Sequence, residues 1–202
     1  MPPAGLHNRM LLAPPSGTGS IYLGIRNRQL APPDIGRNGE RSPKKHKRTT
    51  LEITIYTDGS ALGNPGPGGY GVVMLAGRFR KELSQGYRLT TNNRMELMAV
   101  CVALETLRFE GSDVTLYSDS KYVVDAVTKG WVFGWERKGF AGKKNPDLWM
   151  RFLRIYRRHH VRFVWVKGHA ETVENNRCDQ LAVAAANDRL HLLEDTGYTP
   201  GA

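Results

Sequence analysis

The sequence predicts an α/β protein with a mixed five-stranded sheet, antiparallel on one side and parallel on the other, flanked by helices. Two observations support this prediction. Three strand-like runs of alternating, β-branched residues follow one another across short glycine-containing turns, which is typical of an antiparallel meander. Further along the chain, strand-like and helix-like runs alternate, and strands joined through helices lie parallel through right-handed crossovers.

Composition divides the chain near residue 50. Residues 1–50 are rich in Pro, Gly and Arg, lack sustained periodicity and end in the basic cluster KKHKR at 44–48. They are predicted to be a disordered basic extension, and residues 51–200 a single folded domain. The extension is interpreted as a poorly constrained tail or the result of a misassigned start codon. A nucleic-acid-binding arm and an acid-poor organelle-targeting peptide are the alternatives.

The folded domain divides into elements by periodicity. The meander is expected from three strands, at residues 51–57, 70–76 and 81–90. The run at 92–109 is apolar on nearly every side over much of its length, so it predicts a buried helix. The remaining elements are expected to be a strand, two helices, a strand and a final helix, at residues 113–119, 120–127, 145–158, 159–167 and 175–188.

Charge and cysteine content restrict the functional classes. The formal net charge is +10, which favours a polyanionic partner such as nucleic acid, although residues 1–50 hold nine Lys/Arg against two Asp/Glu and account for most of it. Cys101 and Cys178, each inside a helix-like run, fit a reduced, cytoplasmic compartment better than a disulfide framework. No apolar run approaches the roughly 20 residues that cross a bilayer, so no membrane association is expected.

The glycine-rich stretch YTDGSALGNPGPGGYG at 56–71 raises the question of nucleotide binding. Gly66, Gly68 and Gly71 have the spacing of a dinucleotide-binding turn, but the β-branched run that follows predicts a strand where that turn requires a helix. No Gly-Lys-Ser/Thr follows either, which excludes a phosphate-binding loop of the Walker type. The glycines instead predict a tight connection with positive φ and close backbone approach, which presents Asp58 at the end of the first strand.

Four carboxylates are candidate metal ligands: Asp58, Glu96, Asp119 and Asp179. Taken singly, each has a simpler explanation, respectively as a turn residue, a capping-box partner of Asn93, a helix cap and a helix-dipole charge. If the first and fourth strands are parallel neighbours, however, Asp58 and Asp119 emerge at the same sheet edge. Glu96 and Asp179, each expected in the first turn of a helix, can reach that edge too.

Four converging carboxylates would raise one another's pKa unless a cation neutralises them. Oxygen ligands select Mg²⁺ or Mn²⁺ over zinc or copper. Two such ions stabilise the attacking and leaving oxygens of an in-line phosphoryl displacement. An acidic metal centre in a basic protein therefore indicates cleavage of a polyanion.

Five segments, in order between Leu51 and Tyr198, resemble bacterial-type ribonuclease HI: YTDGSALGNPGPGGYG, TTNNRMELMA, YSDSKYV, WVKGHAETVENNRCDQLA and LEDTGY. The resemblance implies a ribonuclease H-like fold and a monomeric, Mg²⁺-dependent endoribonuclease with two ions per site when substrate is bound, Mn²⁺ being an alternative. Such an enzyme hydrolyses the RNA strand of RNA/DNA hybrids, leaving 5′-phosphate and 3′-hydroxyl ends. The family's metal-binding acids match Asp58, Glu96, Asp119 and Asp179, which with His169 form the implied catalytic set.

The resemblance also implies roles for side chains around the acids. His169 matches a loop histidine that assists proton transfer or product release. Asn64, Asn92 and Asn93 offer donors and acceptors suited to the 2′-hydroxyls and base edges of the hybrid's minor groove. Thr91 matches a residue that holds a DNA-strand phosphate, and an ordinary helix cap is its simpler explanation.

The segment 129–144 carries five Lys/Arg against a single Glu, interleaved with aromatic residues. This combination suits tracking of a nucleic-acid backbone. It resembles the family's basic protrusion, which grips the DNA strand, and implies substrate contacts by Trp131, Trp135 and Lys138. Lys121, where relatives often have Gln, is expected to make a charge contact with the hybrid.

Two further departures from the family pattern leave the acids untouched. Phe140 stands where close relatives often have a third Trp, and little change is expected from it. Leu89 stands where some relatives place an Arg, and Arg88 faces the other side of its strand, so phosphate affinity is expected to differ.

Two other functions remain as alternatives to cleavage of hybrids. A catalytically idle hybrid-binding module would be expected to lack at least one of the four acids, and none is replaced. A DNA-processing enzyme on the same fold is disfavoured by the asparagine cluster and the TTNNRMEL segment.

Overall fold

The computed structural model describes residues 52–167 and 173–200. The predicted extension at 1–50 and the candidate His169 lie outside the described residues, so the boundary near residue 50 and the role of this histidine stay predictions.

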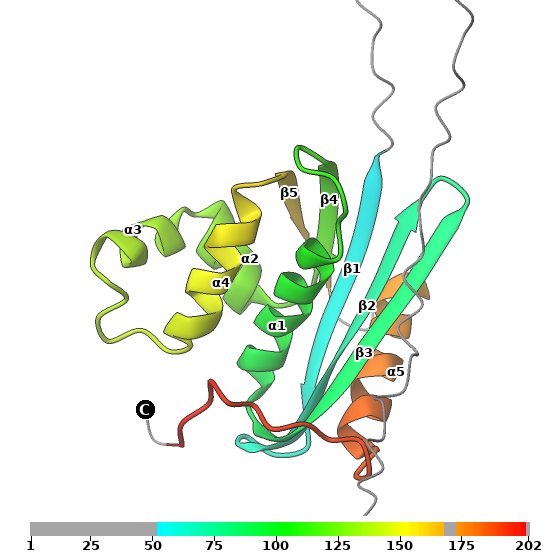
Figure 1. Cartoon of the computed structure of the whole chain (residues 1–202), viewed down its shortest axis with the longest axis vertical. Helices are drawn as coiled ribbons and strands as arrows, with labels where there is room; N and C mark the ends of the chain where they lie inside the picture. Colours follow the sequence, from blue (N-terminus) through cyan, green and yellow to red (C-terminus); the bar gives the residue numbers. More distant parts are fainter. Residues whose placement is uncertain (1–51, 168–172, 201–202) are drawn as a thin grey trace, which may run out of the picture. The chain divides into compact units, whose positions relative to one another are not determined.

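The described chain forms a five-stranded sheet in the order β3-β2-β1-β4-β5 (Figure 1). The first three strands pair antiparallel, and β4 and β5 continue the sheet parallel to β1. The predicted fold class, a mixed sheet with an antiparallel and a parallel side, is therefore confirmed. The strands are β1 (Ile53–Ala61), β2 (Gly66–Ala76), β3 (Phe79–Thr90), β4 (Asp113–Ser118) and β5 (His160–Trp165).

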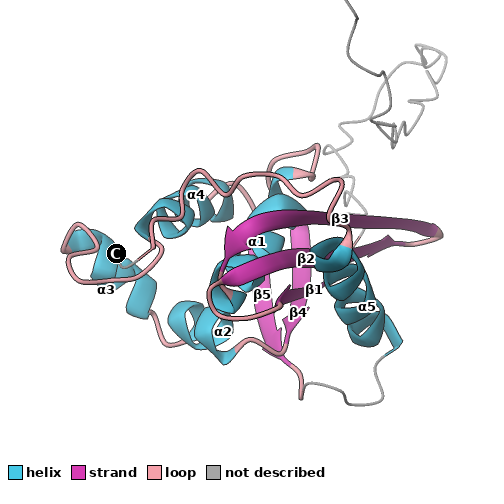
Figure 2. Cartoon of the chain, turned by 90° about the horizontal axis from the view of Figure 1, so that it is seen from below, coloured by secondary structure: helices cyan, strands magenta, loops and turns pink. Residues whose placement is uncertain are grey.

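Helices cover both faces of the sheet, with α5 on one face and α1 on the other (Figure 2). The helices are α1 (Asn92–Glu105), α2 (Lys121–Thr128), α3 (Trp131–Arg137), α4 (Pro146–Tyr156) and α5 (Val173–Asn187). The core lies mainly between the sheet, α1 and α4, where Leu97, Trp149 and Phe152 are completely buried. None of the helices in the described ranges is long and apolar enough to cross a lipid bilayer.

Helix α1 is buried along most of its length, as its nearly all-round apolar pattern predicted. Helix α4 buries the apolar stripe that the sequence indicated, and Trp149 within it packs edge-on against Phe152 and Trp135. Burial of large aromatic side chains contributes strongly to stability. This packing anchors α4 and α3 to each other.

Helix α3 was not predicted, because no helix or strand was expected between residues 127 and 145. It begins after Gly130, which has a φ of 72°, and it buries Val132. Only part of this short helix faces the core. Its mixture of basic and aromatic residues therefore shows no helical repeat of apolar positions from which a helix could be predicted. The segment 129–144 is thus partly helical, and Trp135 anchors it to α4 through its contact with Trp149.

Candidate active site

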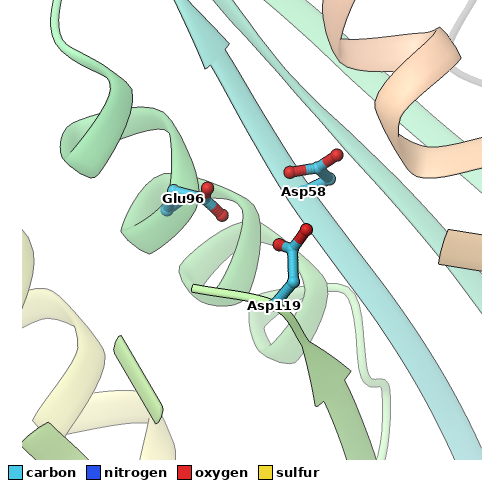
Figure 3. A group of neighbouring side chains, drawn as sticks. All are labelled: Asp58, Glu96 and Asp119. Carbon is cyan, nitrogen blue, oxygen red and sulfur yellow. The ribbon is translucent and has the colours of Figure 1, made fainter. Parts of the chain in front are cut away.

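Three of the four candidate acids meet at one place. Asp58 comes from β1, Glu96 from α1 and Asp119 from the turn after β4, and one carboxylate oxygen of each lies within 4.8 Å of the others (Figure 3). The parallel register explains how two of them converge. Pairing of β1 with β4 ends at Thr57 and Ser118, so the next residue on each strand is one of the acids.

The position of Asp58 differs from the prediction in one respect. It is not the end of its strand, because β1 continues to Ala61 by pairing with β2 alone. Asp58 is instead the first residue beyond the parallel pairing, where β1 has lost its neighbour on one side. The candidate metal ligands therefore gather where the parallel pairing of β1 and β4 ends, and not where β1 itself ends.

Gly59 allows helix α1 to approach this edge. A Cβ atom at Gly59 would collide with the backbone nitrogen of Glu96, so only glycine permits the contact between strand and helix. The N–H of Gly59 also donates a hydrogen bond of 2.8 Å to Oδ1 of Asp58. The glycine after the aspartate thus serves to bring the two carboxylates together.

The glycine-rich stretch does not form a nucleotide-binding loop. Strand β2 begins at Gly66, so the glycines lead into a strand and not into a helix, as predicted. Among them only Gly63 has a positive φ, 112°, and the expectation of positive φ is correct for this residue alone. Gly69 and Gly71 serve close approach instead, because a Cβ on either would collide with the backbone of α5.

The electrostatic state of the acids is unusual. Burial, followed by the charge of Asp119, raises the pKa of Asp58 to about 7. Burial, followed by the charges of Asp58 and Asp119, raises the pKa of Glu96 well above its ordinary value. Oε1 of Glu96 accepts a hydrogen bond of 3.3 Å from Nδ2 of Asn92, whereas Oε2 is buried and has no hydrogen-bond partner among the residues that the structure describes. A bound cation would satisfy this oxygen and remove the repulsion.

Asp179 lies beside the group of three and outside it. It projects from α5, and its charge contributes to the raised pKa of Asp58. Two expectations about helix starts were wrong. Helix α5 begins at Val173, and the N-cap of α1 is Thr91, so Asp179 and Glu96 both lie in a second helical turn and not in a first.

The expected capping box is also absent at the start of α1. Because the N-cap is Thr91, Glu96 cannot be the N3 partner of Asn93. Thr91 itself makes no side-chain capping hydrogen bond. Asp119 likewise does not cap α2, whose N-cap is Ser120. The simpler structural explanations offered for Glu96 and Asp119 therefore do not apply.

The predicted asparagines lie next to the acids. Oδ1 of Asn64 accepts a hydrogen bond of 3.1 Å from the backbone N–H of Asn92, which ties the β1–β2 turn to the start of α1. Asn64, Asn92 and Asn93 are exposed, and Thr91 is half-buried. A cavity of about 730 Å³ adjoins them between the starts of α1 and α4, lined by Asn64, Thr91, Asn93, Lys143, Lys144 and Asn145 among others.

The sequence did not reveal the role of Arg94, which lines the same cavity. Its guanidinium is 2% exposed and lies 2.8 Å from carboxylate oxygens of both Asp195 and Asp147. Thr90 also donates a hydrogen bond to Asp195. These contacts hold the starts of α1 and α4 against the C-terminal LEDTGY segment. Ion pairs over such sequence separations leave no local pattern, and the only signal was a charged residue at the start of a buried helix.

Three of the remaining predicted substrate residues, Trp131, Trp135 and Lys138, lie on α3 or directly after it. Trp131 is 47% exposed, with the Lys129 ammonium 4.9 Å from its ring centroid. Trp135 is partly buried, and Lys138 is exposed. Both tryptophans and Lys138 line a cavity of about 430 Å³. The fourth, Lys121, is the first residue of α2 and follows Asp119 by two positions in the chain.

A mixed sheet with helices on both faces and converging carboxylates at its parallel edge defines an α/β protein with a candidate divalent-metal centre. The RNase H family model matches residues 50–187. The chain belongs to the RNase H family.

Similar proteins agree with this assignment. A ribonuclease H from Trichodesmium erythraeum (strain IMS101) is 56% identical over 157 residues, covering 75% of this chain and 98% of that protein. The crystal structure of LC9-RNase H1 is similar with a TM-score of 0.62 and 34% identity, covering 68% of this chain and 72% of that one. LC11-RNase H1 in complex with an RNA/DNA hybrid is similar with a TM-score of 0.53 and 29% identity, covering 68% and 99% of the two chains.

Proposed function

We propose that this chain is an endonuclease that hydrolyses the RNA strand of RNA/DNA hybrids and leaves 5′-phosphate and 3′-hydroxyl ends. The observation that carries the proposal is the convergence of Asp58, Glu96 and Asp119 within 4.8 Å of one another on an RNase H fold. The similarity to a solved ribonuclease H1 bound to an RNA/DNA hybrid supports the choice of substrate.

The donor set fits divalent metal ions. All the candidate ligand atoms are carboxylate oxygens, which Mg²⁺ and Mn²⁺ prefer. Oε2 of Glu96 has no hydrogen-bond partner within residues 52–167 and 173–200, and it is an available ligand atom. Asp58, Glu96 and Asp119, with Asp179 beside them, would hold two Mg²⁺ ions, or Mn²⁺ in their place. When bound, the ions supply charge stabilisation for the attacking and leaving oxygens of phosphoryl transfer.

The polar side chains around the acids bind and orient the hybrid. Asn64, Asn92 and Asn93 face the minor groove with amide donors and acceptors that recognise 2′-hydroxyls and base edges. The hydrogen bond between the Asn64 side chain and the Asn92 backbone holds two of them in register with Glu96. Thr91 holds a phosphate of the DNA strand beside the cavity at the start of α1.

The basic and aromatic residues of the α3 region extend this binding surface along the duplex. The half-exposed ring of Trp131 and the exposed Lys138 contact the DNA strand together with Trp135, and Lys121 contacts a phosphate nearer the acids. His169 moves a proton at the leaving group or assists product release. The two free, buried cysteines suit a reducing compartment, and we place the enzyme in the cytoplasm as a monomer.

The direct test is cleavage of labelled substrates by the purified full-length chain. RNA in an RNA/DNA hybrid is expected to be cut in Mg²⁺ and to survive in EDTA, whereas double-stranded DNA and double-stranded RNA survive in both. Asp58→Asn is expected to lower the rate about 1,000-fold or more, because loss of a metal ligand removes several kcal/mol of transition-state stabilisation.

The matched control is Asp188→Asn, which makes the same chemical change at an exposed aspartate after α5 and is expected to cut at the parental rate. Intact hybrid RNA in Mg²⁺ with the parent protein would contradict the proposal and favour an idle hybrid-binding module. Equal cutting by parent and Asp58→Asn would contradict the assignment of the site.

A further inference from the structure

Trp165 touches the backbone of one of the three converging acids. It is the last residue of β5 and lies opposite Ser118 in the parallel register with β4. Its indole Nε1–H donates a hydrogen bond of 3.0 Å to the backbone carbonyl oxygen of Asp119. The side chain is nevertheless 44% exposed, so burial alone does not explain its position.

The backbone carbonyls of Ser118, Asp119 and Ser120 each accept a hydrogen bond, and Trp165 donates one of the three. The carbonyl of Ser118 accepts the backbone N–H of Val166 at 3.1 Å, which extends the pairing of β4 with β5. The carbonyl of Ser120 accepts the N–H of Val124 at 2.9 Å, which is the first turn of α2. The carbonyl of Asp119 lies between the end of the sheet ladder and the start of the helix. This carbonyl accepts its hydrogen bond from a side chain, the indole of Trp165.

A second contact bears on the same indole ring. The ammonium of Lys121, the first residue of α2, lies 5.2 Å from the ring centroid of Trp165, within the range of a cation–π interaction. The indole is therefore held both through its N–H and through its ring. Because one partner is the carbonyl of Asp119 itself and the other is Lys121, two residues further along, the orientation of the ring and the path of the turn after β4 depend on each other.

We propose that Trp165 is a positioning residue for the metal centre: its indole N–H fixes the peptide of Asp119 so that this carboxylate meets Asp58 and Glu96. The inference rests on the proposed function, because it assumes that the three carboxylates bind divalent ions. Groups that orient metal ligands commonly change metal affinity or activity when they are removed. The usual loss on removing a group that orients a ligand side chain is about 10- to 100-fold. Because Trp165 acts through the backbone of its ligand, we expect a smaller effect.

The test is Trp165→Phe, which removes the N–H donor and keeps an aromatic ring beside Lys121. Calorimetric titration of Mn²⁺ into the full-length protein without substrate is expected to show binding about 3- to 10-fold weaker than in the parent. In cleavage of the hybrid, kcat is expected to fall by a similar factor and KM to stay within about twofold. Parental Mn²⁺ affinity and kcat in Trp165→Phe would overturn the proposal.

Two further variants separate positioning from general disturbance. Phe109→Leu alters another exposed aromatic residue that lies under a cation, Arg108 at 5.4 Å, and it is expected to leave Mn²⁺ affinity unchanged. Lys121→Met keeps the indole N–H, and it is expected to raise KM while Mn²⁺ affinity changes by less than about twofold. If Lys121→Met weakens Mn²⁺ binding as much as Trp165→Phe does, the assignment to the N–H is wrong.

The outcomes also distinguish this proposal from the proposed function. A parent protein that neither binds Mn²⁺ nor cuts the hybrid overturns both. A parent that does both, with a Trp165→Phe variant indistinguishable from it, overturns the positioning role alone. A purely structural role would lower the unfolding temperature of Trp165→Phe without changing the Mn²⁺ dissociation constant, and that result would also contradict the proposal.

Discussion

Glu96 and Arg94 lie two positions apart at the start of α1 and therefore point to opposite sides of the helix. Both are buried among carboxylates, but their surroundings differ in charge balance. Arg94 holds Asp195 and Asp147 through hydrogen bonds of 2.8–2.9 Å. Glu96 lies close to Asp58 and Asp119, and its Oε2 has no hydrogen-bond partner in the described part of the chain. We call the first group the compensated cluster (Arg94, Asp147, Asp195), because one of its members is a cation, and the second the uncompensated cluster (Asp58, Glu96, Asp119), because all three of its members are acids.

The difference separates a structural role from a functional one within one turn of a helix. The compensated cluster contains its own cation, so its charges stabilise the contact between α1, α4 and the C-terminal segment. The uncompensated cluster lowers stability as long as no cation is bound, and a protein retains such an arrangement where it serves function.

The largest effect on stability is expected from removing the internal cation. Arg94→Met leaves Asp195 buried without its partner, and it is expected to lower the free energy of unfolding by about 3–5 kcal/mol. Chemical denaturation in EDTA measures this change. Arg158→Met, which breaks an exposed pair with Glu110, is the matched control and is expected to cost less than about 1 kcal/mol. Equal losses in the two variants would contradict the special role of Arg94.

The uncompensated cluster is expected to make stability fall as pH rises. The pKa of Asp58 is about 7 in the folded protein and near 3.8 when unfolded, so between these values the folded state binds more protons. The free energy of unfolding in EDTA therefore falls between about pH 4 and pH 7, by at most about 4 kcal/mol from Asp58, and levels off above.

Denaturation of the parent and of Asp58→Asn across this pH range isolates the contribution, because the asparagine does not titrate. The difference in stability between them is expected to shift in favour of the variant as pH rises. Saturating Mg²⁺ is expected to remove most of the pH dependence of the parent. A pH-independent difference between the two proteins would count against an uncompensated cluster.

The smallest effect is expected at the outer partner of Arg94. Asp147 is 38% exposed and solvent screens its charge, whereas Asp195 keeps Arg94 paired when Asp147 is altered. Asp147→Asn is expected to cost about 1 kcal/mol in chemical denaturation. Asp195→Asn, the same change at a buried position, is expected to cost clearly more. A larger loss of stability in Asp147→Asn than in Asp195→Asn would show that burial does not set the strength of this cluster.

Sequence patterns predicted the uncompensated cluster better than the compensated one. Alternating runs and crossovers predicted the mixed sheet. The convergence of Asp58 and Asp119 depended on the condition that the first and fourth strands are parallel neighbours, which the pairing of β1 with β4 satisfies. The helix starts were less accurate, because asparagines such as Asn93 are good caps wherever they occur. Tertiary contacts decided instead that Thr91 begins α1.

The compensated cluster had no signature in the sequence. Arg94 and Asp195 are 101 positions apart, and neither belongs to a periodic pattern that would relate them. Helix α3 was hidden for a similar reason, because its mixture of basic and aromatic residues shows no clear apolar stripe. Both features depend on long-range packing, which local propensity does not contain.

The central claim, that the uncompensated cluster binds divalent ions, is tested most directly by titrating Mg²⁺ into the parent and into Glu96→Gln by calorimetry at pH 8. Glu96→Gln removes a charge and keeps the shape of the side chain. We expect Mg²⁺ to bind the parent and to bind the variant at least about tenfold more weakly. Equal Mg²⁺ affinity in the two proteins would contradict the claim.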